Sequence, residues 1–521
     1  SRSFDTFDAT GHKRSLSNKD LTTAMTALNR SYGSSNGSTD SSRTTFVKSM
    51  KRARSTSSRN ISNAYNSNLL PPRNISADGT SRARRALLTK LNSTAPSFSK
   101  SFAATLTSNN LQMNQNTPTT IHGAFEQSAQ LHPKRTAIVC SDGRRLSFLV
   151  LNRMANRLAR YLMTLGVPWR NTSASISNEI NNPPLQCVGV CATGHWSIIA
   201  MLGIMKTGNA YVPLDPNYPA SRVAFMAQDS CLSLVITENI LKSNASVSQL
   251  NTLIVGGTKE KLITLLSIDE KWTSICSKCS AEPLSSNEIS QQINNPEKNT
   301  TETSTENAIK NKTNTDNTNH RDVAYVLYTS GSTGKPKGVC GTHAAMLNRF
   351  EWMWNEYPFH STELVCSKTS LNFVDSIFEI FGALGCGIPI LIVPNDIRSD
   401  PEELIRLLAR AHVTRLIAVP SLLRAMLQIR PDLGSVLPHL KTWTISGEAL
   451  PLDLVNLFFE NAPEGSRLLN LYGSTEVAAD VTCMEITLND VMSGRLKEMG
   501  PIVPIGYPIS NTDVLIVDPG K

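Results

Sequence analysis

From about residue 120 onward, short apolar runs alternate with longer stretches in which apolar residues recur every three or four positions. The short runs are typical of buried strands and the longer stretches of amphipathic helices. Strands are predicted at 136–140, 187–192, 232–237, 323–328, 389–394, 414–420, 441–446 and 467–473, and helices at 120–131, 145–167, 197–206, 401–412, 421–429 and 452–460. Strands that alternate with helices predict an α/β fold whose sheets are mostly parallel. Ligands in such folds collect at the carboxyl ends of the strands.

Residues 1–117 show no such period and are dominated by Ser, Thr, Asn, Arg and Lys. A segment of this composition buries too little apolar surface to offset its ordering entropy, so a disordered basic tail is predicted. The remainder, 118–521, is expected to form one large domain. Two polar, low-complexity insertions within it, 168–186 and 274–320, are expected at the surface.

The net charge of +9 is confined to the tail. Of the 51 Lys and Arg residues, 17 lie in the first 100 positions with 5 of the 42 acids, so that stretch carries +12 and the rest −3. The basic clusters at 51–54 and 82–85 suit either an acidic partner, an import signal or plain solvated disorder, and nucleic-acid binding is not favoured. Ten scattered cysteines indicate free thiols, hence a cytoplasmic location. The most apolar window, 188–205, is interrupted by Thr193, Gly194 and His195, so no membrane association is predicted.

The segment "YTSGSTGKPKG", 328–338, follows a buried strand and combines glycines, hydroxyl residues and two lysines. Glycines let backbone amides approach a polyanion, hydroxyls donate hydrogen bonds, and lysines add charge. We interpret it as a triphosphate-binding loop, with a flexible surface loop as the alternative. It is not a Walker A loop, because Pro336 follows Gly334 and Lys335 where that motif has Ser or Thr.

This loop resembles the signature of the adenylate-forming superfamily, which includes acyl-CoA synthetases, luciferases and nonribosomal peptide synthetase adenylation domains. The resemblance extends from about 120 to 521. Further matching motifs are "LSF" (146–148), "MKTGNAYVPLDPNYP" (205–219), "SGEAL" (446–450), "NLYGSTE" (470–476) and "IGYPISNTDVLIVD" (505–518). It implies the family's large N-terminal domain, with stacked, mostly parallel sheets flanked by helices. By the same resemblance a small C-terminal domain would follow Lys521 and is absent from this chain.

The resemblance implies that ATP and Mg²⁺ are bound. Its catalytic residues would be Lys335, Lys337, Thr475 and Glu476, with Glu476 as the Mg²⁺ ligand. Its ATP-binding residues would be Thr329, Ser330, Gly331, Ser332, Thr333, Gly334, Gly447, Glu448, Asn470, Tyr472, Gly473 and Ser474. One departure is Ser474, where the family usually has proline.

Asp375 is a single acid within the apolar run "NFVDSIFEIF", 372–381. One interpretation is helix capping, in which Asp375 or Ser376 caps a helix over 377–384. The other follows the resemblance. Members that activate α-amino acids place an ammonium-binding aspartate directly after the phenylalanine, whereas here Val374 stands there and the acid comes one residue later. A β-amino acid carries its ammonium one C–C bond, roughly 1.5 Å, farther from its carboxylate.

The implied substrate-binding residues are Phe373, Val374, Asp375, Phe378, Ile417, Thr444, Ser446, Leu471, Ala479 and Asp480. This set resembles that of β-alanine-selecting domains, and of Ebony-type β-alanyl-amine synthetases in particular. Two acids, Asp375 and Asp480, would then serve one ammonium, since a buried cation needs neutralisation.

The predicted function is ATP-dependent activation of an amino acid, β-alanine above others, as an aminoacyl-adenylate. The acyl group would pass to phosphopantetheine on a carrier domain outside this chain, and then to a bioamine acceptor. Two alternatives remain open. One is an acyl-CoA synthetase-type ligase for an uncharged carboxylic acid. The other is a catalytically incomplete fragment that lacks the lysine-bearing C-terminal domain.

Overall fold

The computed structural model describes residues 4–7, 13–16, 118–170, 185–255, 261–285, 323–330 and 334–516. The chain divides into two compact units, Ser1–Leu111 and Gln112–Lys521. In the first, β1 (Phe4–Phe7) and β2 (Lys13–Leu16) form an antiparallel pair, which the polar composition did not predict. The other residues of 1–117 lie outside the described part, so the disordered tail stays a prediction. The two larger sheets belong to the second unit.

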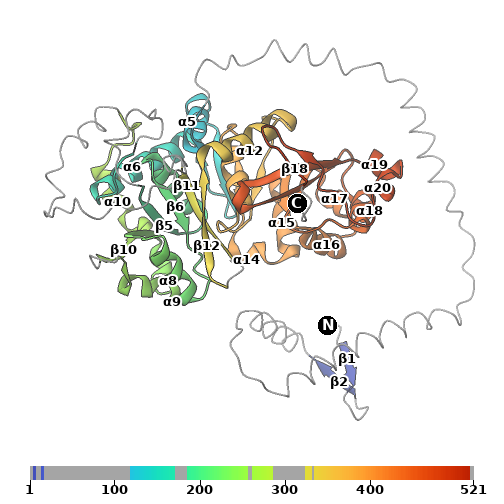
Figure 1. The fold of residues 1–521 in the computed structure, drawn as a ribbon, viewed down its shortest axis with the longest axis horizontal. Helices are drawn as coiled ribbons and strands as arrows, with labels where there is room; N and C mark the ends of the chain where they lie inside the picture. Colours follow the sequence, from blue (N-terminus) through green and yellow to red (C-terminus); the bar gives the residue numbers. More distant parts are fainter. Residues whose placement is uncertain are drawn as a thin grey trace, which may run out of the picture. The chain divides into compact units, whose positions relative to one another are not determined.

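One sheet has six strands and is parallel except at one edge. Its order is β10 (Thr264–Ser267), β7 (Leu234–Thr237), β5 (Cys187–Cys191), β6 (Ala210–Pro213), β11 (Val323–Ser330) and β12 (Pro336–Thr342). β11 and β12 are antiparallel, so the predicted phosphate loop is the turn of a hairpin. In Figure 1 this hairpin lies between the green and the orange parts of the chain.

The other sheet has nine strands, and its five central pairings are parallel. Its order is β19 (Tyr507–Pro508), β18 (Ala479–Ile486), β17 (Arg467–Ser474), β16 (Thr442–Ile445), β15 (Arg415–Ala418), β13 (Val365–Ser367), β14 (Ile390–Ile392), β3 (Thr136–Cys140) and β4 (Arg145–Ser147). A short antiparallel pair, β8 (Ile254–Val255) and β9 (Lys261–Leu262), stands apart. The predicted α/β class with mostly parallel sheets is confirmed.

Helices occupy the connections between these strands (Figure 1). The longer ones are α5 (Ile121–Leu131), α6 (Phe148–Thr164), α7 (Gly194–Lys206), α8 (Ala220–Asp229), α10 (Ile268–Lys278), α12 (His343–Glu356), α15 (Pro401–Ala411), α16 (Pro420–Ile429) and α18 (Leu452–Asn461). Shorter ones are α9 (Ala245–Ser248), α13 (Asp375–Ile377), α14 (Asn395–Arg398), α17 (Leu433–Val436), α19 (Leu488–Met492) and α20 (Arg495–Glu498). Single 3₁₀ turns span Asn239–Leu241, Gln249–Thr252 and Thr475–Val477.

Both sheets share one apolar core. The same buried cluster contains Val190 and Ile236 of the six-stranded sheet and Ile138 and Leu469 of the nine-stranded sheet. Ten of the 13 residues of α7 are buried, which explains why its sequence is apolar on every side. The two sheets therefore pack as one unit. The shared core fixes the positions of the carboxyl ends of their strands.

Boundaries predicted from the local sequence were wrong where a strand pairs with a distant strand or where a helix is irregular. The expected helix over 145–167 is a strand, β4, followed by α6, because residues 145–147 pair with β3 and the Ser147 hydroxyl caps α6. The helix expected over 377–384 begins earlier, as α13, and continues as a π-helical turn over Phe378–Gly382. α10 extends to Lys278, into the insertion expected from 274, whereas 286–322 and 171–184 lie outside the described residues.

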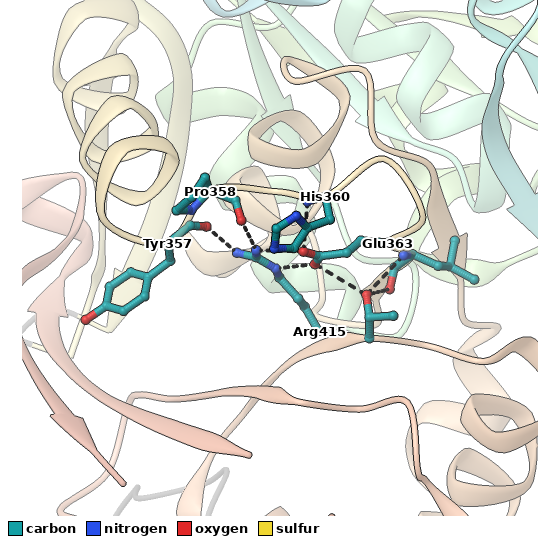
Figure 2. Close-up of polar contacts among 7 residues, drawn as sticks. Tyr357, Pro358, His360, Glu363 and Arg415 are labelled. Atoms are coloured by element: carbon teal, nitrogen blue, oxygen red, sulfur yellow. Dashed lines mark hydrogen bonds and ion pairs between the residues drawn. The ribbon is translucent and has the colours of Figure 1, made fainter. Parts of the chain in front are cut away.

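A buried ion pair braces the start of β15 against the segment before β13 (Figure 2). Arg415 donates to both carboxylate oxygens of Glu363, at 2.9 Å to Oε1. It also donates to the carbonyls of Tyr357, at 2.8 Å, and Pro358, at 2.7 Å. Because each buried charge is paired and hydrogen-bonded, the desolvation cost of the pair is offset.

Candidate active site

The predicted substrate-binding residues lie together where β13, β15, β16 and β17 end. The register pairs Ile417 of β15 with Thr444 of β16, and Ser446 directly follows β16. Most of the set is buried: Val374, Phe378, Ile417, Thr444, Ser446, Leu471, Ala479 and Asp480. Phe373 differs from the rest of the set, because the residue is 61% exposed. It lies in the turn before α13, where its carbonyl accepts a hydrogen bond from the Ser376 hydroxyl.

Asp375 is the first residue of α13 and is half-buried. The helix begins at Asp375 itself, its N-cap position is Val374, and no side-chain hydrogen bond caps it, so the interpretation that Asp375 or Ser376 caps the helix is wrong. Burial, followed by the carboxylates of Asp480 and Glu379, raises the pKa of Asp375 from 3.8 to about 7, although Arg349 and Lys368 oppose the shift. The Asp375 carboxylate forms no ion pair with a described residue. The ammonium group of a substrate could serve as its counter-ion.

The raised pKa of Asp375 predicts that amino-acid binding weakens in acid. An ammonium ligand binds the ionised carboxylate, so below the pKa of about 7 a proton must leave first. We expect the Kd of the amino acid to rise about tenfold for each pH unit below 7 and to level off above it. Titration calorimetry at pH 5.5 to 8.5 measures this. Asp375→Asn should flatten the profile, and a wild-type profile that is already flat would contradict the prediction.

Asp480 already has a cation from this chain. Arg349 of α12 donates to its Oδ2 from Nε at 3.0 Å and from Nη2 at 2.8 Å. The Ser446 hydroxyl donates to Oδ1 at 3.1 Å. The expectation that two unpaired acids share one ammonium therefore needs correction: Asp375 alone lacks a cationic partner among the described residues. Sequence reasoning missed Arg349, although a charge inside "AAMLNRFEWMW" was a usable sign.

A bulge between β17 and β18 sets the position of Asp480, whose carboxylate contacts Arg349 and Ser446. The register shifts between Tyr472, opposite Thr482, and Gly473, opposite Asp480. A Cβ on Gly473 would stand 1.6 Å from the Ala479 carbonyl oxygen, so only glycine fits. Ala479 has a φ of 83°, a strained value for a residue other than glycine.

The β11–β12 hairpin, which carries the predicted phosphate loop, lies close to Glu476, which follows β17 of the other sheet. The Thr329 hydroxyl, at the end of β11, lies 3.4 Å from Oε1 of Glu476. Lys335 and Lys337 are exposed in the same hairpin, and Gly334 has a φ of 80°. Residues Gly331, Ser332 and Thr333 lie outside the described part, and Ser330 is exposed. The loop and Glu476 are thus close enough to contact one polyphosphate.

Glu476 has the character that a Mg²⁺ ligand requires. It is exposed, and hydrogen bonds from its own backbone amide and from Ser474 hold its pKa below the ordinary 4.5. Among the described residues, no group of three or more His, Cys, Asp or Glu side chains could hold a metal ion. A single carboxylate suits Mg²⁺, which takes its other oxygens from phosphates and water.

The residues predicted to bind the adenine ring are arranged only partly as expected. The Tyr472 ring is 54% exposed and free to stack, and Gly447 has a φ of 84°. Glu448 is held by Ser421, which donates from its backbone amide at 3.0 Å and from its hydroxyl at 2.8 Å. The buried side-chain amide of Asn470 donates to the Pro504 carbonyl at 2.9 Å, and its role in ATP binding stays a prediction.

Comparison with known proteins decides the family. The profile of the AMP-binding enzyme family, described as "AMP-binding enzyme", matches residues 125–521. The chain belongs to this family of adenylate-forming ligases. ATP is therefore the nucleotide that this adenylate-forming enzyme uses.

Relatives of this adenylate-forming enzyme include peptide synthetases. "Beta-alanyl-bioamine nonribosomal peptide synthetase ebony" of Drosophila melanogaster is 32% identical over 77% of this chain and 41% of its own length. "Zwittermicin A synthase ZmaJ" of Bacillus cereus is 30% identical over 77% of this chain and 64% of its own length. The chain thus spans less than two thirds of either relative.

A solved nonribosomal peptide synthetase, FmoA3 (S1046A) in its AMPPNP-bound form, shares the fold. Its TM-score is 0.57 at 24% identity, over 77% of this chain and 36% of the solved chain. Within the part of the chain that the structure describes, no helix is both long and apolar enough to cross a bilayer.

Proposed function

We propose that this chain activates a β-amino acid, with β-alanine as its first candidate, by forming the aminoacyl-adenylate from ATP. The observation that carries the proposal is Asp375, a half-buried carboxylate with a raised pKa and no cation of its own. Its place, one residue beyond the position used for α-ammonium groups in similar domains, suits an ammonium set farther from the reacting carboxylate.

The relative named as a β-alanyl-bioamine synthetase supports the same substrate. By analogy the activated acyl group would pass to phosphopantetheine on a carrier domain, and then to a bioamine. Both steps need parts that lie outside residues 1–521, so they are proposals about the whole protein.

The chemistry asked of this chain is alignment and charge stabilisation. The substrate carboxylate attacks the α-phosphorus of ATP and pyrophosphate leaves, so negative charge builds up on the phosphates. Lys335 and Lys337, in the hairpin whose Thr329 contacts Glu476, would stabilise that charge, and Thr475 adjoins Glu476. Glu476, with the phosphates, would hold Mg²⁺, which neutralises phosphate charge when bound.

A substrate panel in ATP–pyrophosphate exchange tests the proposal, using the full-length protein. β-Alanine, alanine, aspartate and a medium-chain fatty acid are compared. We expect β-alanine to exceed the others by about tenfold or more in kcat/KM, because only its amine reaches Asp375 with the carboxylate in line. Preference for the fatty acid would favour an acyl-CoA-type ligase, and preference for alanine would overturn the β-amino acid assignment.

A further inference from the structure

Arg349 contacts two of the predicted substrate-binding residues, Asp480 and Phe378. It is 1% exposed and comes from α12, which packs against β18 (Figure 1). Its guanidinium carbon stands 4.6 Å from the ring centre of Phe378 and 4.9 Å from that of Trp352. Its partners Phe378 and Asp480 belong to the predicted substrate-binding set. The positive charge of Arg349 therefore changes the net charge that a ligand of these residues would meet.

The hydrogen bonds of Asp480 leave little of its charge for a substrate. Two nitrogens of Arg349 bind one oxygen, and Ser446 binds the other. Buried and charge-assisted bonds of this kind are among the stronger ones in proteins. Arg349 Nη1 is also buried, with no hydrogen-bond partner among the described residues. One end of the guanidinium group is therefore positively charged and has no acceptor.

We propose that Arg349 is a specificity-determining residue that restricts this site to amino acids with one ammonium group. It neutralises Asp480, so Asp375 remains as the one acid of the predicted substrate-binding set without an ion pair among the described residues, and it repels a second cation. The inference rests on the proposed activation of an amino acid, and goes beyond it by assigning the number of positive charges that the substrate carries.

The test replaces Arg349 with Met, which is similar in length and uncharged, or with Gln, which still donates to Asp480. Both should free the Asp480 charge for a second ammonium. With 2,3-diaminopropionate, the β-amine can occupy the place at Asp375 and the α-amine the place near Asp480. We expect the ratio of kcat/KM for this diamino acid over β-alanine to rise about tenfold or more, as one new charge pair in a partly buried site would give. ATP–pyrophosphate exchange with the full-length protein measures it.

The control is the double variant Arg349→Met with Asp480→Leu, which removes both charges and should stay folded. It should show no gain for the diamino acid. A residue with a purely structural role would lower kcat for both substrates and leave their ratio unchanged, which would overturn the proposal. Loss of a cooperative melting transition in both single variants would also overturn it, since the pair would then serve folding.

Failure of the proposed function would look different. If the wild type rejects β-alanine but activates another monoamino acid, the β-alanine assignment fails. The ratio is then measured for that acid and its diamino analogue, and the role of Arg349 is still decided.

Discussion

Asp375→Asn is expected to lower kcat/KM for the amino acid by about 100- to 5,000-fold, because removing one partner of a buried ion pair costs about 3–5 kcal/mol. The KM for ATP should change little, since the phosphate loop and Glu476 are untouched. Exchange assays at pH 8 measure both constants. Asp396→Asn, which changes an exposed acid, is the matched control and should behave as wild type.

The same substitution should make the protein more stable in base. The folded-state pKa of Asp375 is raised from 3.8 to about 7, so ionisation opposes folding as the pH rises from the lower value to the higher. The gain in unfolding free energy is about 1.4 kcal/mol for each unit of pKa shift relieved. Asp375→Asn should therefore melt at a higher temperature than wild type at pH 8, with the gap narrowing towards pH 4. Full activity in this variant would mean that another group holds the amine.

Glu363→Ala is expected to destabilise the domain by about 3–5 kcal/mol, because it leaves the buried Arg415 guanidinium unpaired. Figure 2 shows how few other groups could take over: the remaining acceptors of Arg415 are the carbonyls of Tyr357 and Pro358. Arg415 begins β15, which carries Ile417 two residues later, so the site is expected to loosen as well. The urea midpoint, followed by fluorescence and by circular dichroism, measures the loss.

An exposed ion pair supplies the control for Glu363. Glu402 contacts Arg406 one turn along α15, and both side chains are more than half exposed. Glu402→Ala should cost under about 1 kcal/mol, since solvent screens such pairs. Equal effects at Glu363 and Glu402 would show that the buried network contributes no more than a surface pair. Replacing Glu363 by Leu together with Arg415 by Met should recover most of the loss.

Sequence alone determined the features that depend on neighbours along the chain. The alternation of apolar runs and amphipathic stretches located β5, β15, β16 and β17 and their helices, because strand and helix periods are set within a few residues. The glycine-rich loop and the motif around Glu476 indicated a polyphosphate site, since their residue types fit that chemistry. The single acid at 375 in an apolar run predicted a substrate-binding residue for the same reason.

Tertiary structure decided what depends on contacts between distant residues. β4 exists because it pairs with β3, whereas its own sequence resembles the start of a helix. Arg349 and Asp480 are 131 residues apart, and Asn470 meets Pro504 across 34. A charge's role follows from its partner and its dielectric surroundings, which only the folded chain brings together. Hence the sequence could predict two acids, Asp375 and Asp480, among the substrate-binding residues. The structure decided that, of these two, only Asp375 forms no ion pair with a described residue.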